Sequence, residues 1–317
     1  MKQKMISALM IGALALSAMP ACASDDEQSF VDVGADAWYY GVVSEMVAEG
    51  YMNGISATHF APDEVLTREM FVTLLGRVAQ VEPARYDGET VFDDVYAGAW
   101  YAPYVAWAQE TGLVSGITAD AFGVGQAITR EQMAALVTRF VNQLTLVTMP
   151  EDAQALEAFS DQDAVAPYAQ DAVAFVRVHG LMNGAENAAF QPKAATTRAE
   201  SAAVLSRLLD KLQQCKVALL ADDIQAITLK AQTTVPPTVL TVTEAAEVQQ
   251  IVTHLQAMPI EGIAHIPAST GWQYWLEIVW TDGTRTGCHL NDGWIEMDGI
   301  RYDTTEGYFT ALLEMVG

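Results

Sequence analysis

A short pattern occurs three times in this chain and constrains its fold more than any other feature. The pattern is Thr-Arg followed by Glu or by Ala-Glu, and its arginines, Arg68, Arg130 and Arg198, lie 62 and 68 residues apart. Each copy opens with Phe-x-Asp and has one glycine 18 residues before the arginine and a second glycine four residues later. The aspartates are Asp32, Asp94 and Asp161, and the first glycines are Gly50, Gly112 and Gly180. Such agreement indicates an internal repeat with a period of about 65 residues.

An apolar stripe follows each arginine at the spacing of a helix. After Arg130 the stripe contains Met133, Leu136, Val137 and Phe140, and the other two copies have apolar residues at most of these offsets. Such offsets place the side chains on one face of an amphipathic helix. We therefore expect a helix to begin at each of the three arginines.

The threonine before each arginine is predicted to be the N-cap of that helix. These threonines are Thr67, Thr129 and Thr197. A threonine hydroxyl at this position accepts a hydrogen bond from an N–H group that the helix leaves unpaired. Gln132 and Glu200 stand three residues after their threonine and complete a capping box, whereas repeat one has Met70 there.

The arginine itself is out of place on electrostatic grounds. It occupies the first helical position, where the helix dipole is already positive and an acidic residue is favoured by roughly 0.3–1 kcal/mol. A cation there in all three copies suggests that an anion binds, because a helix N-terminus and a guanidinium together recognise carboxylates or phosphates. The alternative is a structural ion pair with a neighbouring repeat, with Asp32, Asp94 and Asp161 as the candidate partners.

Two further elements complete the pattern. Trp-Tyr occurs at 38–39 and 100–101, and each copy has a turn of the form Gly, two apolar residues, Asn or Ser, and Gly. With these elements, residues 28–213 resemble three tandem S-layer homology domains. The resemblance implies a mainly α, pseudo-threefold unit with binding grooves between the repeats. It also implies an exported protein that attaches non-covalently to the bacterial cell wall through a secondary cell wall polymer, often one that carries pyruvate ketals.

The resemblance also implies where the ligand binds. The motif arginines are expected to meet the acidic sugar, and the N-cap threonines and motif aspartates are further candidates for the groove. Trp38 and Trp100 have two interpretations: they stack on a sugar face at a groove edge, as the resemblance favours, or they are large packing residues. Repeat three has Tyr168 and Ala169 in place of Trp-Tyr. Tyr39 and Tyr101 are expected in the core.

The chain is strongly acidic, which excludes some partners. It has 40 acidic and 16 basic residues, for a formal net charge of −24. Nucleic-acid binding needs basic patches, and an acidic surface is not attracted to anionic membranes. An anionic ligand must therefore be captured locally, by a few arginines.

Residues 1–23 are typical of a secretory signal peptide, because lysines precede an apolar run that ends in small residues. We expect cleavage after Ala23, with lipoprotein anchoring at Cys22 as the alternative. The remaining Cys215 and Cys288 can pair but do not make a disulfide framework. No later stretch reaches the roughly 18 apolar residues of a membrane span.

The predicted organisation is a signal peptide, three repeats and a separate C-terminal domain. The repeats are placed at 28–80, 90–144 and 157–213, and the last domain at 218–317. After Cys215 the pattern changes to short alternating segments separated by Asp-Gly turns, which predict strands. A helix after Thr243 and a final helix complete a small α+β domain.

The C-terminal domain carries no recognised catalytic motif. There is no G-x-S-x-G, H-E-x-x-H or phosphate-binding loop. Cys288 and His289 are adjacent in a predicted strand, so their side chains point to opposite faces, which suits neither a metal nor a nucleophile–base pair. Trp272, Trp275 and Trp280 indicate a core or an interface rather than carbohydrate binding.

We therefore expect a wall-anchoring module and no enzyme, metal or cofactor, with the C-terminal domain displayed at the cell surface for an unknown partner. One alternative is a glycan-active enzyme that the repeats target to the wall. A glycosidase would need two carboxylates facing each other across a cleft, and no acidic pair is set apart by its spacing. Another alternative is that the repeats mediate protein–protein contact.

Overall fold

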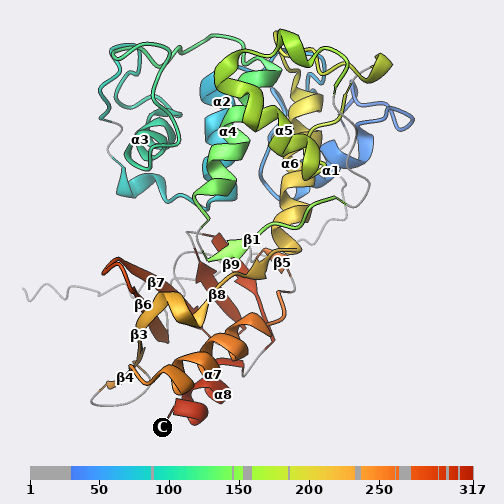
Figure 1. Cartoon of the computed structure of the whole chain (residues 1–317). Helices are drawn as coiled ribbons and strands as arrows, with labels where there is room; N and C mark the ends of the chain where they lie inside the picture. The colour runs from blue at the N-terminus through green and yellow to red at the C-terminus, as the bar shows by residue number, and fades with distance from the viewer. Residues whose placement is uncertain are drawn as a thin grey trace, which may run out of the picture.

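The computed structural model describes residues 30–316, apart from residues 87–88, 145, 153–158, 185, 233–236, 261, 264–272, 292, 298–299 and 306–307 (Figure 1). The expected signal peptide, with Cys22, and also Trp272 lie outside the described residues. The described part has a helical N-terminal region and a sheet-rich C-terminal region. The predicted fold class, mainly α repeats followed by a small α+β domain, is confirmed.

Each repeat contributes two helices, and the second begins at the motif arginine as predicted. The first helices are α1 (Tyr40–Ala48), α3 (Ala102–Glu110) and α5 (Gln170–Val178). The second helices are α2 (Arg68–Val78), α4 (Arg130–Asn142) and α6 (Arg198–Gln213). Shortly after each first helix comes a glycine in the left-handed region, with φ of 74° at Gly50, 74° at Gly112 and 67° at Gly180. Glycine adopts this conformation without steric strain, which explains why it recurs at the helix end.

The capping boxes form in the two repeats that have the residues for them. The Thr129 hydroxyl accepts from the Gln132 N–H, and the Gln132 side chain accepts from the Thr129 N–H. Thr197 and Glu200 make the same reciprocal pair. Thr67 makes no side-chain cap bond, and its hydroxyl is buried without a hydrogen-bond partner among the described residues.

The three repeats are interleaved. The first helix of each repeat packs on the second helix of the preceding repeat: α3 lies on α2, α5 lies on α4, and α1 lies on α6. The last contact joins repeat one to repeat three and closes the circle. Because every second helix buries its stripe partly against another repeat, no repeat has a complete core of its own.

A ring of main-chain hydrogen bonds also closes at the start of the second helices. The N–H of Leu66 donates to the carbonyl of Thr196, that of Thr196 to Ile128, and that of Ile128 to Leu66, at 2.9, 3.0 and 3.0 Å. The N–H groups of the three motif arginines form a second cycle in the opposite sense, because Arg68, Arg130 and Arg198 donate to the carbonyls of Gln126, Ala194 and Glu64 at 2.9 to 3.0 Å. Equivalent positions thus bond in a cycle, which is the pseudo-threefold arrangement that the resemblance implies.

The C-terminal domain is connected to the repeats by more than a linker. Strand β1 (Val147–Thr148), which follows repeat two, pairs antiparallel with β2 (Lys216–Val217), which follows α6. The side chain of Gln256 donates to the carbonyl of Leu219 at 2.7 Å. In Figure 1 the long helix α6 runs from the helical region towards the sheet-rich region.

In its described residues, the C-terminal domain is built on one antiparallel sheet of seven strands, in the order β4-β3-β6-β7-β8-β9-β5. The strands are β3 (Ile224–Ala231), β4 (Thr238–Val242), β5 (Gly262–Ile263), β6 (Tyr274–Trp280), β7 (Arg285–Asn291), β8 (Trp294–Met297) and β9 (Ile300–Asp303). Helices α7 (Ala245–Gln256) and α8 (Tyr308–Val316) pack together and lie side by side below the sheet in Figure 1. Successive side chains of a strand point to opposite faces of the sheet, and those on one face, such as Leu229, Leu276 and Leu290, are buried.

The alternating strands and the two helices predicted for this domain are found in its described residues. Two details differ. The N-cap of α7 is Glu244, without a side-chain cap bond, and not Thr243. The two-residue strands β1, β2 and β5 were not predicted, because a pair of residues carries no alternation to recognise.

Candidate functional site

The motif aspartates each hold a loop of their own repeat through main-chain N–H groups. Asp32 accepts from Phe60 and Ala61 at 2.9 and 2.7 Å. Asp94 and Asp161 make the same bonds to the equivalent loops, and Asp94 accepts a third from Val124, where the other repeats have proline. Burial acts to raise the pKa of Asp32 and Asp94, but these N–H donors outweigh it and hold each pKa below its ordinary value.

The motif arginines bind the same loops from an adjacent repeat. Arg198 donates from Nε to the carbonyl of Phe60 at 2.8 Å and from Nη2 to that of Asn53 at 2.6 Å. Its guanidinium also lies 4.6 Å from the centre of the Phe60 ring. Arg130 repeats all of these contacts on repeat three, and Arg68 repeats the Nε bond and the ring contact on repeat two. The peptide at each loop phenylalanine is thus held at its N–H by an aspartate and at its carbonyl by an arginine.

The ion-pair alternative is therefore wrong about the partner. Among the described residues the motif aspartates form no salt bridge with the arginines, because their oxygens accept main-chain N–H groups instead. The arginines are 7 to 8% exposed, and burial lowers the pKa of each. A guanidinium still keeps its proton, so it needs acceptors, and carbonyls of the adjacent repeat supply them. These bonds explain how a cation is tolerated at the start of a helix.

We call a junction the place where a motif arginine meets the loop and second helix of the adjacent repeat. The first junction joins Arg198 to repeat one, the second joins Arg68 to repeat two, and the third joins Arg130 to repeat three. The first junction is a groove of about 490 Å³. It is lined by Met52, Asn53, Gly54, Ile55, Leu66, Met70, Thr73, Leu74, Arg77, Trp100 and Arg198, so all three repeats contribute to it.

The two tryptophans of the Trp-Tyr motif are surface residues. Trp38 is 66% exposed and Trp100 is 56% exposed, and each ring contacts the next tyrosine edge-on at 5.3 Å. The packing interpretation is therefore wrong for both. Trp100 lines the groove of the first junction, whereas Tyr101 is buried as expected. Tyr39 is partly buried against the core.

A second set of arginines was missed by the sequence analysis. Arg77, Arg139 and Arg207 stand nine residues after the motif arginines, a recurrence that the repeat frame could have revealed. Arg77 lines the groove and donates to the carbonyl of Tyr51 at 2.6 Å. The charge of Arg139 acts to lower the pKa of Arg68, and the charge of Arg207 acts to lower the pKa of Arg130, in addition to the larger effect of burial. Each junction therefore combines two guanidinium groups.

The motif aspartates and two of the three N-cap threonines have structural partners. The hydroxyls of Thr129 and Thr197 accept helix N–H groups, and the aspartates hold their loops. Their role as ligand contacts stays a prediction. The second junction differs in its aromatic residue, because the Tyr168 hydroxyl donates to Glu131 at 3.1 Å and burial raises the pKa of Tyr168 to about 12.

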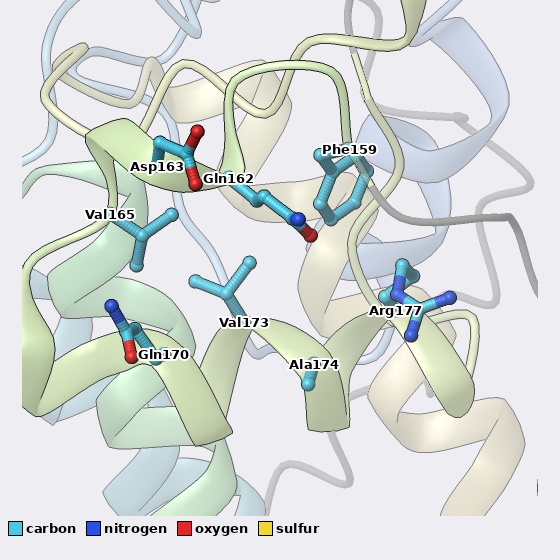
Figure 2. Close-up of a pocket in the computed structure, with 8 residues that line it drawn as sticks. All are labelled: Phe159, Gln162, Asp163, Val165, Gln170, Val173, Ala174 and Arg177. Atoms are coloured by element: carbon cyan, nitrogen blue, oxygen red, sulfur yellow. The ribbon is translucent and has the colours of Figure 1, made fainter.

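Another cavity, of about 270 Å³, lies within repeat three between α5 and the 3₁₀ helix η2 (Gln162–Ala164) (Figure 2). It is lined by Phe159, Gln162, Asp163, Val165, Gln170, Val173, Ala174 and Arg177. Figure 2 shows Asp163 and Arg177 at opposite ends of this cavity. It contains no motif arginine and carries charges of both signs, so it is a weaker candidate for an anion than the first junction.

The described residues of the C-terminal domain offer no comparable site. Cys288 is buried, whereas the adjacent His289 lies near Glu296 with 3.3 Å between Nδ1 and Oε1. Cys215 and Cys288 do not form a disulfide, and burial raises the pKa of the Cys215 thiol to about 12. Within the described ranges, no group of His, Cys, Asp or Glu is arranged to hold a metal ion. Trp275 contacts the His289 ring, and Trp280 donates to the Thr286 hydroxyl.

Comparison with known proteins agrees with this geometry. The profile of the S-layer homology domain matches residues 29–69, 91–134 and 158–202. The chain carries three S-layer homology domains. They contain all three motif arginines and the lining residues of the first junction other than Met70, Thr73, Leu74 and Arg77. The matched ranges end soon after each arginine, so the second arginines lie beyond them.

The relatives share these domains. An amylopullulanase from Thermoanaerobacterium thermosulfurigenes is 31% identical over 185 residues, 58% of this chain and 10% of that protein. An endoglucanase from a Bacillus species is 34% identical over 184 residues, 58% of this chain and 19% of that protein. A cellulosome-anchoring protein from Acetivibrio thermocellus is 26% identical over 167 residues, 51% of this chain and 35% of that protein. The chain thus spans a small part of these relatives. In the described part, no helix combines the length and apolar character needed to cross a membrane.

Proposed function

We propose that the S-layer homology domains hold the chain non-covalently on the bacterial cell wall by binding an acidic secondary cell wall polymer at the junctions. The observation that carries the proposal is the groove of the first junction, where Arg198 and Arg77 lie with the exposed indole of Trp100. In a chain of net charge −24, this concentrates cations at one place. The relative named as a cellulosome-anchoring protein supports the same role at the cell surface.

The groove suits a sugar that carries a carboxylate, such as a pyruvate ketal. A carboxylate accepts charge-assisted hydrogen bonds from guanidinium N–H groups, and the apolar face of a sugar ring packs on an exposed indole. A single groove of this kind binds weakly, but a polymer that reaches several junctions of one chain gains from effective concentration. The domain architecture therefore fits a repeating polymer better than a small free sugar.

Sedimentation of the full chain with cell-wall sacculi tests the proposal. It is measured before and after the secondary polymer is removed by acid extraction. We expect the full chain to sediment with intact walls and to stay in solution with stripped walls. Trp100→Ala should weaken sedimentation, because it removes an exposed groove residue. The matched control is Tyr96→Ala, which removes an exposed aromatic of the same repeat that does not line the groove.

The same experiment separates the alternatives. If the chain bound stripped walls, and bound the proteins of those walls equally well, contact with a protein would be favoured over polymer binding. A glycan-active enzyme would release soluble sugars or clear a zone in a gel that contains cell wall. We propose that the C-terminal domain is displayed by the anchor and has no such activity, so no zone is expected. The similarity to glycan-degrading relatives lies in the S-layer homology domains and not in their catalytic parts.

A further inference from the structure

We propose that the residue three positions after the N-cap threonine decides whether a junction accepts an acidic ligand. Glu200 closes the third junction, whereas Met70 and Gln132 leave the first and second junctions open. This inference rests on the proposed function, since it ranks the junctions for the same class of acidic sugar.

The third junction contains its own carboxylate. Glu200 Oε1 lies 4.0 Å from Arg130 Nη1, and the Arg130 side chain is nearly buried. The position of Glu200 is held by its capping box, because its Oε2 accepts the N–H of Thr197 at 2.9 Å. The Arg130 guanidinium also donates from Nε and Nη2 to carbonyls of repeat three. Arg130 therefore already has a carboxylate of the protein itself beside its guanidinium.

The first junction has no charge at the equivalent position. Met70 lines the groove together with Arg198. It takes the position that Glu200 has in the third junction, and its thioether carries no charge. Glu64 acts electrostatically on Arg198, but it is exposed and does not line the groove. The cost of this arrangement is the missing capping box of Thr67. An incoming carboxylate meets Arg198 and Arg77 without a competing carboxylate in the lining.

The second junction has a neutral amide at this position. Gln132 makes the same capping box as Glu200 but carries no charge. The nearby Glu131 is already occupied, because its oxygens accept from Lys193, Tyr168 and the N–H of Ala166. The charges of Arg68 and Arg139 both act to lower the pKa of the Tyr168 hydroxyl, against the larger effect of burial. This junction therefore keeps a net positive charge for an acidic ligand.

A reciprocal exchange tests the inference, because glutamine and glutamate both form the capping box. Glu200→Gln gives the third junction the residue of the second, and Gln132→Glu does the reverse. The probe is a fragment of acidic cell wall polymer that carries one pyruvate ketal, titrated into the full chain by calorimetry. We expect two sites per chain in the wild type, a third site in Glu200→Gln, and a single site in Gln132→Glu, because the added carboxylate closes the second junction as Glu200 closes the third.

Two controls keep the result specific. Thermal melts should match the wild type in both variants, since the cap bonds are retained. The wild type and both variants should bind a fragment without the ketal equally weakly, because that fragment carries no carboxylate. Met70→Glu, which places a carboxylate in the groove, should weaken binding of the acidic fragment at the first junction.

The outcomes separate this inference from the proposed function. Three equal sites in the wild type, or exchange variants that bind the acidic fragment as the wild type does, would overturn the inference while the proposed function stands. A wild-type chain that binds neither the fragment nor the intact wall would overturn both. A third site that appears in Glu200→Gln and is absent from the wild type supports the inference.

Discussion

The repeat region and the C-terminal domain are held together by different groups. In the repeats, partly buried aspartates bind main-chain groups of a loop in their own repeat, and buried arginines bind the same loop from the adjacent repeat. In the C-terminal domain the main-chain ladder of one sheet makes the long-range connections, and pairs such as Arg285–Glu277 lie at its surface. Charged side chains therefore decide assembly in the repeats and are peripheral in the sheet. The repeats consequently use the same arginines for stability and for the proposed binding.

The largest expected effect on the free energy of unfolding comes from Arg130→Ala. The change removes two donors and leaves the carbonyls of Phe190 and Asn183 without them in a buried site, which should lower the free energy of unfolding by roughly 2–4 kcal/mol. In the C-terminal domain, Arg285→Ala removes a side chain that is 66% exposed, and the loss should be below about 1 kcal/mol.

Urea unfolding of the full chain, followed by tryptophan fluorescence, measures both changes. A similar small loss for the two variants would break the comparison, because the repeat arginines would then act only in binding.

An intermediate effect is expected from acid. The pKa values of Asp32 and Asp94 are depressed in the folded chain, so the stability they contribute is fully present above the unfolded pKa of about 3.9 and is lost as pH falls through the lower folded values. Asp94→Asn should lower stability at neutral pH, because an amide has only one acceptor oxygen and at least one of the three N–H groups then loses its acceptor. It should also flatten the fall in stability below about pH 4.

Melting temperatures of the wild type and Asp94→Asn between neutral pH and pH 3 measure this effect. If the difference between the two proteins stayed constant across that range, the Asp94 carboxylate would not be the group that titrates.

The smallest expected effect is a gain. Thr196 stands in the closed main-chain ring where the other repeats have Leu66 and Ile128, and its hydroxyl is buried without a partner among the described residues. Thr196→Val replaces the hydroxyl with a methyl group of similar size and should stabilise the chain by about 1 kcal/mol. In the sheet, the Thr228 hydroxyl has a partner in Thr241 at 3.1 Å, so Thr228→Val should give no gain.

Thermal denaturation of the two valine variants compares the sites directly. A loss of stability in Thr196→Val would mean that the hydroxyl has a partner in solution, such as a bound water.

The site could be predicted only in part. The groove residues Arg198 and Trp100 belong to the motifs, so the sequence pointed to them. Arg77 and Met70 also line the groove, but neither belongs to the short motifs, and their role depends on which helix face meets the adjacent repeat. The Glu200–Arg130 contact was also not predicted, because it joins residues of two repeats whose relative placement no local pattern contains.

The sequence by itself determined the repeat, the starts of the second helices, two capping boxes and most strands of the C-terminal domain. These features depend on residues within a few positions of one another, where side-chain chemistry and periodicity act directly. The tertiary structure alone decided the partners of the charged motif residues. Arg198 reaches carbonyls 138 and 145 residues away in the sequence, and such bonds exist only after the three repeats have closed into a ring. A buried guanidinium takes whichever acceptors the closed ring brings within reach, and here these are carbonyls of the adjacent repeat rather than its aspartate.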